Sequence, residues 1–60
     1  MEIFIKEDLI DLYRRLIATG DEIYMSQDGL TMDVYYLGKT FRITSIQVED
    51  YILVTDIKEV

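Results

Sequence analysis

The chain contains no cysteine and no histidine, and it also lacks proline and tryptophan. Without the first two residue types it has neither disulfides nor the usual protein ligands of zinc, haem and iron–sulfur clusters. The aspartate-rich loop that binds calcium in EF-hands is missing as well. We therefore expect no metal and no cofactor. The fold has to rest on a packed core, with self-association as a further source of stability.

Residues for catalysis are equally scarce. Histidine is the commonest general acid or base at neutral pH, and Ser26 and Ser45 have no histidine with which to form a triad. The segment "LGKT" (37–40) resembles the end of a phosphate-binding loop, but position 33 is Asp where that motif needs glycine. A chain of 60 residues is also too short to enclose a sugar between paired carboxylates. We expect a protein that is not an enzyme.

Long hydrophobic runs are absent too. No segment approaches the roughly 18 apolar residues of a membrane span, and the start "MEIFIKED" lacks the basic and apolar regions of a signal peptide. Half of the residues are nevertheless hydrophobic, which is ample for folding and argues against disorder. We expect one small domain over residues 1–60, soluble and cytoplasmic.

Basic residues are in the minority, since twelve acids against six bases give a formal charge of −6. Nucleic-acid binding relies on lysine and arginine to neutralise phosphates, so nucleic acid is an improbable partner. An acidic chain suits a basic surface on a larger protein, or simply solubility.

Residues 7–19 have the pattern of an amphipathic helix. Apolar side chains recur at helical spacing and form one wide stripe: Leu9, Ile10, Leu12, Tyr13, Leu16 and Ile17. Asp8 is placed to cap the start of this helix, and Gly20 to end it as the residue after its last turn.

From residue 21 onward the apolar positions alternate, which indicates strands. Asp28-Gly29 predicts a first hairpin, and Gly38-Lys39 predicts a second with a type II′ turn, which places Tyr35 opposite Arg42. The two hairpin registers agree with each other, because together they place all inward residues on one face, beneath the helix: Ile23, Met25, Met32, Val34, Tyr36, Phe41 and Ile43.

The alternation slips by one residue at Thr44-Ser45. A β-bulge there would return Ile46 and Val48 to the core face. A third turn at Glu49-Asp50 leads to the last strand, "YILVTDI", which is apolar on both faces. If this strand lies at a sheet edge, it favours a homodimer, because exposed apolar edges are usually covered.

These elements predict an α+β fold. One N-terminal amphipathic helix packs on a four-stranded antiparallel β-meander, which strong twist and bulging would curl toward a half-barrel. Residues 2–5, "EIFI", form either a short extra strand or an extension of the helix.

Two surfaces emerge as candidate protein-binding sites. A single helix covers one face of a sheet, and the opposite face carries Tyr and Arg side chains of the kind enriched at interaction hot spots. The residues expected on this face are Tyr24, Asp33, Tyr35, Leu37 and Arg42. The second surface is an acidic pole at one end of the meander, where the turns carry Asp28, Glu49 and Asp50 and the helix start is expected to add Glu7, Asp8 and Asp11.

In style the chain resembles short, acidic, cysteine-free α+β proteins, many of them encoded by phages and mobile elements, that act by blocking a host protein. We expect a regulatory or inhibitory protein that binds a larger, basic protein. The alternatives are a homodimeric assembly module and a binder of single-stranded nucleic acid that stacks bases on the exposed tyrosines.

Overall fold

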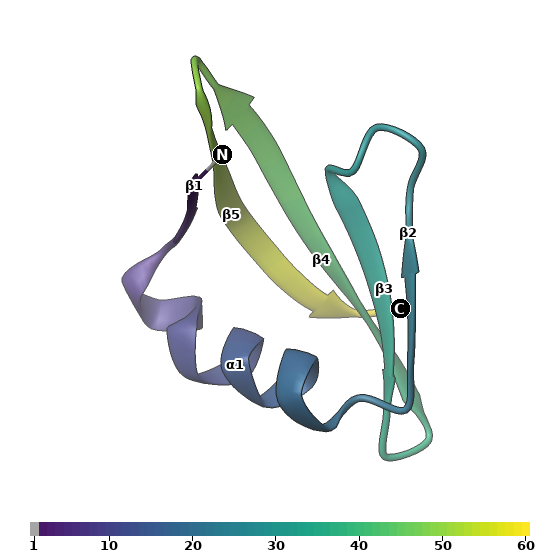
Figure 1. The fold of residues 1–60 in the computed structure, drawn as a ribbon. Helices are drawn as coiled ribbons and strands as arrows, with labels where there is room; N and C mark the ends of the chain where they lie inside the picture. Colours follow the sequence, from purple (N-terminus) through teal and green to yellow (C-terminus); the bar gives the residue numbers. More distant parts are fainter. Residues whose placement is uncertain (1) are drawn as a thin grey trace.

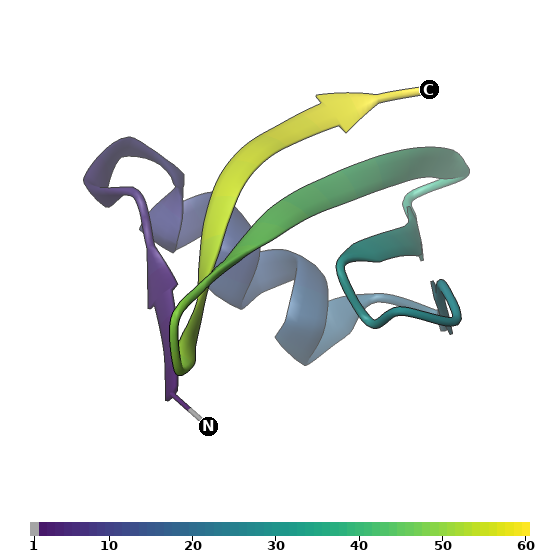
Figure 2. The ribbon, with the colours of Figure 1, turned by 90° about the horizontal axis from the view of Figure 1, so that it is seen from above.

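The computed structural model describes residues 2–60, which form a single curled sheet with one helix inside the curl (Figures 1 and 2). Strand β1 (Glu2–Ile5) leads through a 3-10 turn (Glu7–Leu9) into helix α1 (Ile10–Thr19). The remaining strands are β2 (Glu22–Met25), β3 (Thr31–Tyr36), β4 (Lys39–Val48) and β5 (Tyr51–Glu59). The α+β class and the curl agree with the sequence.

The sheet has five strands in the order β1-β5-β4-β3-β2 and is mixed, not purely antiparallel. Residues 2–5 form the extra strand, and it lies parallel to β5, with Glu2 opposite Tyr51 and Ile5 opposite Val54. Parallel neighbours cannot be joined by a tight hairpin, and here α1 and strands β2, β3 and β4 all lie between β1 and β5 in the sequence. Within residues 2–60, β5 is therefore not an edge strand, and β1 and β2 are the two edges.

The core is small and lies between α1 and the concave face of the sheet. Leu16 is fully buried, and it clusters with the three buried sheet residues Val34, Ile43 and Val54. Other side chains of the predicted helical stripe and of the strands pack around this cluster: Ile5, Leu9, Leu12, Tyr13, Met32, Tyr36, Phe41 and Ile57. The predicted core face of the sheet is thus the concave face.

The start of the helix differs from expectation, because Asp8 is not its cap. The chain arrives from β1 and turns in the 3-10 conformation, where the backbone N–H of Leu9 donates to the carbonyl of Lys6 at 2.8 Å. Leu9 then precedes α1, and no side chain caps either segment. The backbone of the 3-10 turn thus takes over a part of the capping role expected of Asp8.

The first hairpin has the predicted register, with Ile23 opposite Val34 and Met25 opposite Met32. The predicted register of the second hairpin is wrong by two residues. Its turn is Leu37-Gly38, where φ is 53° and 74°, and positive values at both positions define type I′ instead of type II′. A shift of two residues leaves every side chain on its predicted face but changes its partner.

The predicted irregularity at Thr44/Ser45 is present, but the extra residue lies on β5. Thr44 pairs with Asp56 and Ser45 with Val54, so Thr55 is the residue that has no partner opposite it. Strand β4 keeps its alternation, and the prediction that Ile46 and Val48 reach the core face is therefore wrong. The bulge on β5 instead lets two apolar residues three positions apart, Val54 and Ile57, both face the core.

The helix covers only part of the concave face, since the tip of the β2–β3 hairpin extends beyond it (Figure 1). Ile23 and Met25 point to this face as predicted, yet they are 44% and 59% exposed. An apolar hollow of about 240 Å³ opens here, lined among others by Ile3, Tyr13 and Met25. The core is thus closed beside Leu16 and open near the hairpin tip.

Gly20 follows the helix as predicted, but packing and not its backbone conformation requires glycine there. Its φ of −63° and ψ of 140° suit any residue. A Cβ atom on Gly20 would lie 2.5 Å from Cγ1 of Val34 and 2.6 Å from the carbonyl oxygen of Leu16. Glycine therefore sets how closely the end of α1 approaches β3.

We predict that Gly20→Ala lowers the free energy of unfolding by about 1–3 kcal/mol, the usual cost of overpacking a core. Chemical denaturation monitored by circular dichroism measures the change. Thr19→Ala, one residue earlier on an exposed position, is the control and should be close to neutral. Equal stability of wild type and Gly20→Ala would contradict the close approach of α1 to β3.

Candidate interaction surface on the convex face

The convex face of the sheet carries no helix within residues 2–60 (Figure 2). Strand pairing brings four of the predicted binding residues together on this face. Tyr24 lies opposite Asp33, and Asp33 lies opposite Arg42, so one row crosses β2, β3 and β4. Tyr35 lies in the neighbouring row, between Glu22 and Thr40.

The two tyrosines are exposed and line a shallow hollow. Tyr24 is 61% and Tyr35 is 46% exposed, and the hollow has a volume of about 510 Å³ with Asp21, Glu22 and Gly38 completing its lining. The Tyr24 hydroxyl donates a hydrogen bond of 2.6 Å to Oε2 of Glu22, and this bond raises the pKa of the Tyr24 hydroxyl above its usual value. The carboxylate thus orients one ring of the pair.

Arg42 forms an ion pair with Asp33 instead of stacking on Tyr35, which corrects the predicted cross-strand partner. Its Nε lies 3.0 Å from Oδ1 of Asp33 and its Nη2 lies 3.2 Å from Oδ2, so the pair is bidentate. The hydrogen bonds from the guanidinium lower the pKa of the Asp33 carboxyl. Tyr35 faces Thr40. The two-residue change in the register of the second hairpin causes both differences.

Leu37 has an unusual position for a large apolar residue. It is the first turn residue of the β3–β4 hairpin, with a φ of 53° and 77% of its surface exposed. Positive φ is costly for a residue with a bulky side chain, and type I′ turns prefer Asn, Asp or Gly at this position. The sequence predicted Leu37 on the face opposite the helix, with Tyr35 and Arg42. The structure places Leu37 in the turn at the edge of this convex face.

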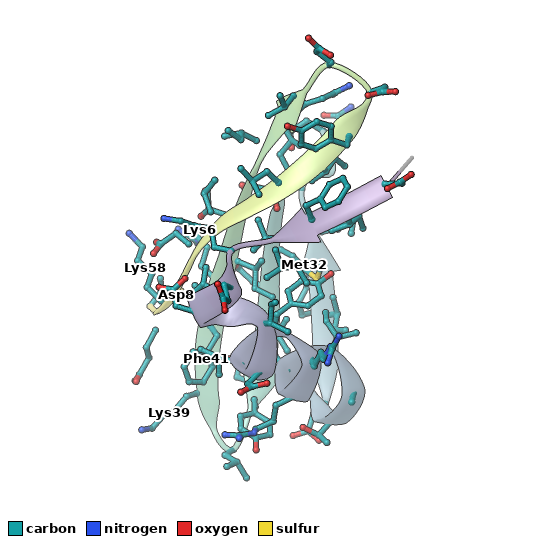
Figure 3. All side chains as sticks on the ribbon, turned by 90° about the vertical axis from the view of Figure 1, so that its left-hand side faces the viewer. Lys6, Asp8, Met32, Lys39, Phe41 and Lys58 are labelled. Atoms are coloured by element: carbon teal, nitrogen blue, oxygen red, sulfur yellow. The ribbon has the colours of Figure 1, made fainter. Side chains whose placement is uncertain are left out.

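The acidic pole is smaller than expected. The β2–β3 and β4–β5 turns do lie at the same end of the sheet (Figure 1). The helix start does not join them, because β1 carries the chain away from that end before the helix begins. Figure 3 shows Asp8 at the far end of β1 from the β4–β5 turn. Glu2, opposite Tyr51, takes the place that Glu7, Asp8 and Asp11 were expected to fill.

Asp28 has a structural role in its turn. Its Oδ1 accepts hydrogen bonds from the Ser26 hydroxyl at 2.6 Å and from the backbone N–H of Leu30 at 3.0 Å. These bonds, the one from Ser26 first, lower the pKa of the Asp28 carboxyl. Glu49 and Asp50 form the two-residue β4–β5 turn, where Glu49 has a φ of 52°. Two of the three predicted turn acids thus face solvent without a comparable network.

The sequence reading missed an apolar cluster at the other end of the convex face. Its members come from β1, β4 and β5, and they are Phe4, Ile46, Val48, Tyr51 and Leu53. Phe4 and Ile46 are 48% and 47% exposed. The available signal was the apolar character of "EIFI" and of the strand "YILVTDI", which is apolar on both faces. This signal predicts a cluster only once β1 is known to pair with β5.

Over residues 2–60, no three metal-ligating side chains gather in one place. In the same range, no helix has the length and apolar character needed to cross a membrane.

We predict that the Asp33–Arg42 pair makes stability depend on pH below about 4, near the ordinary pKa of aspartate. Because the pKa of Asp33 is lowered in the folded state, the unfolded chain binds more protons as the pH falls. The contribution of the pair is present above the ordinary value and is lost as the pH falls through the lowered one.

Denaturant unfolding of wild type and Asp33→Asn between pH 6 and pH 2 tests this dependence. The stability difference between the two proteins should shrink toward low pH. Asp56→Asn is the control, because Asp56 forms no ion pair within residues 2–60. A difference that stays constant from pH 6 to pH 2 would contradict the role of the pair.

Comparison with known proteins identifies no relative of this chain. No protein-family model, no curated protein sequence and no solved structure matches the chain significantly. Its function has to be inferred from its own residues.

Proposed function

We propose that this chain is a small, non-enzymatic regulatory or inhibitory protein that binds a larger protein through its convex face. The observation that carries the proposal is Leu37. This side chain is 77% exposed at a turn position where leucine strains the backbone. A left-handed conformation costs a residue with a Cβ atom about 1–2 kcal/mol, and burial within the chain does not offset this cost. A strained, exposed residue that does not help folding is the kind found at functional sites.

The surroundings of Leu37 support a protein contact. Tyr24 and Tyr35 are exposed nearby, and they line the same hollow as Gly38, the second residue of the turn. Tyrosine is enriched at binding hot spots because it offers a large contact area and a hydroxyl at low conformational cost. The net charge of −6 favours a partner with a basic surface.

Binding of single-stranded nucleic acid has less support on this face. Such proteins stack bases on aromatic rings beside free basic groups. Here the guanidinium of Arg42 is engaged by Asp33, and Lys39 lies 3.8 Å from a carboxylate oxygen of Glu59. Arg42, the basic residue in the same row as Tyr24, is therefore already paired with an acid, and only Lys58, opposite Arg42 on β5, adds a cation to this row that is not ion-paired within residues 2–60.

We predict that Leu37→Asn separates binding from folding. Asparagine suits a type I′ turn followed by glycine, so the free energy of unfolding should rise by up to about 1 kcal/mol. Capture of the partner from cell extract should fall at least about tenfold, the loss typical of a hot-spot residue. Quantitative mass spectrometry of captured proteins, at low and high salt, measures the second effect.

Gln27→Ala is the matched control, an exposed substitution at the tip of the other hairpin. It should leave both stability and capture unchanged. If the more stable Leu37→Asn protein captures the same partner as well as wild type does, the convex face around Leu37 is not the contact.

A homodimeric assembly module is the second candidate, and β2 is the observation in its favour. This edge strand is exposed along its whole length, with Ile23, Tyr24 and Met25 all more than two-fifths exposed. Edge strands with apolar side chains are usually covered by another chain. The last strand, which the sequence suggested for this role, is covered by β1.

Light scattering over a concentration series tests this second candidate. A homodimer formed through β2 would have twice the chain mass of 7.1 kDa at high micromolar concentration. Ile23→Lys, which adds a charge to the edge, should then restore the monomer. A mass of 7.1 kDa for wild type throughout the series would reject the homodimer and leave the heterologous partner.

A further inference from the structure

A third hollow lies on the convex face at the end of β1, away from Leu37. It has a volume of about 250 Å³ and is lined by Glu2, Phe4, Asp50 and Tyr51. The parallel pairing of β1 with β5 creates it, since Glu2 lies opposite Tyr51, and Asp50 is the turn residue just before Tyr51. Two carboxylates and two aromatic rings, distant in sequence, thus line one opening.

The two rings meet edge to face. The centroids of Phe4 and Tyr51 are 5.1 Å apart and the ring planes are inclined by 82°. Phe4 remains 48% exposed in this arrangement. The face of an aromatic ring carries partial negative charge, which attracts cations placed over it.

The two carboxylates have no cation from the described chain. Within residues 2–60, the ion pairs are Lys39–Glu59 and Arg42–Asp33, and neither involves Glu2 or Asp50. The hollow therefore combines two aromatic rings with two carboxylates that form no ion pair within residues 2–60.

We propose that this hollow binds the guanidinium group of an arginine side chain on the partner protein. The proposal rests on the proposed function, because it names a chemical feature of that partner. A guanidinium is planar, stacks on aromatic faces and offers several N–H donors to carboxylates. The neighbouring convex residues Ile46 and Leu53 provide apolar surface for the aliphatic stem of the arginine or for residues beside it.

Titration of the protein with N-acetyl-arginine amide, followed by NMR, tests the proposal. The signals of Phe4, Asp50 and Tyr51 should shift saturably. N-acetyl-citrulline amide has nearly the same shape without the charge, and it should bind at least about fivefold more weakly, as expected from loss of a cation–π contact and charged hydrogen bonds. N-acetyl-lysine amide should fall between the two, because an ammonium cannot stack as a plane.

A double variant, Glu2→Gln with Asp50→Asn, should weaken arginine binding by at least about fivefold. The control double variant, Glu49→Gln with Asp56→Asn, removes the same charge outside the hollow and should bind as wild type does. Equal loss in both variants would mean a general charge effect and would overturn the site. The absence of saturable shifts, or citrulline binding equal to arginine, would overturn it as well.

Two further results separate this site from its alternatives. Arg14 and Arg15 of α1 form no ion pair within residues 2–60. Shifts of the same signals on concentration of the protein alone, abolished by substitution of these two arginines, would mean that a second copy fills the hollow and not a partner. Leu37→Asn should leave arginine binding unchanged. Failure of Leu37→Asn in the capture experiment therefore rejects the contact at the β3–β4 turn, whereas failure of the arginine probe rejects this hollow alone.

Discussion

The packing of Leu16 against Val34, Ile43 and Val54 is the contact on which the rest of the structure depends. Among residues 2–60 these four side chains are the fully buried ones, and they join α1 to β3, β4 and β5. A chain this short buries a modest fraction of its surface, so the core has little reserve. Gly20 belongs to the same constraint, because its missing side chain lets the end of α1 approach Val34.

The parallel pairing of β1 with β5 has consequences on both faces of the sheet. On the concave face it places Ile5 beside the core, opposite the buried Val54 of β5. On the convex face it brings Phe4 against Tyr51 and Glu2 near Asp50. The strand that completes the sheet therefore also creates the hollow to which we assign an arginine side chain.

The convex face divides into two regions with different chemistry. Near the β3–β4 turn lie Tyr24, Tyr35 and the strained Leu37, with Arg42 held by Asp33. Near the β4–β5 turn lie the apolar cluster and the carboxylates of Glu2 and Asp50, which line the hollow beside Phe4 and Tyr51. A partner that spans both regions would meet an apolar anchor at one end and an acidic, aromatic hollow at the other, which suits a basic protein surface better than a nucleic acid.

Periodicity and turn residues in the sequence were sufficient for the helix, for four antiparallel strands and for the inward face of β2, β3 and β4 up to Ile43, since a register error of two residues leaves each side chain on its face. Beyond Thr44 the predicted inward face of β4 was wrong, because the extra residue of the bulge lies on β5. Periodicity and turn residues also did not determine which residues of neighbouring strands lie opposite each other, or that β1 pairs with β5. The choice of Leu37-Gly38 over Gly38-Lys39 as the turn assigns Arg42 to Asp33, and the pairing of "EIFI" with β5 decides which acids gather at one end. Local patterns do not specify such pairing, because the preference of a strand depends on its packing against cross-strand neighbours and on burial.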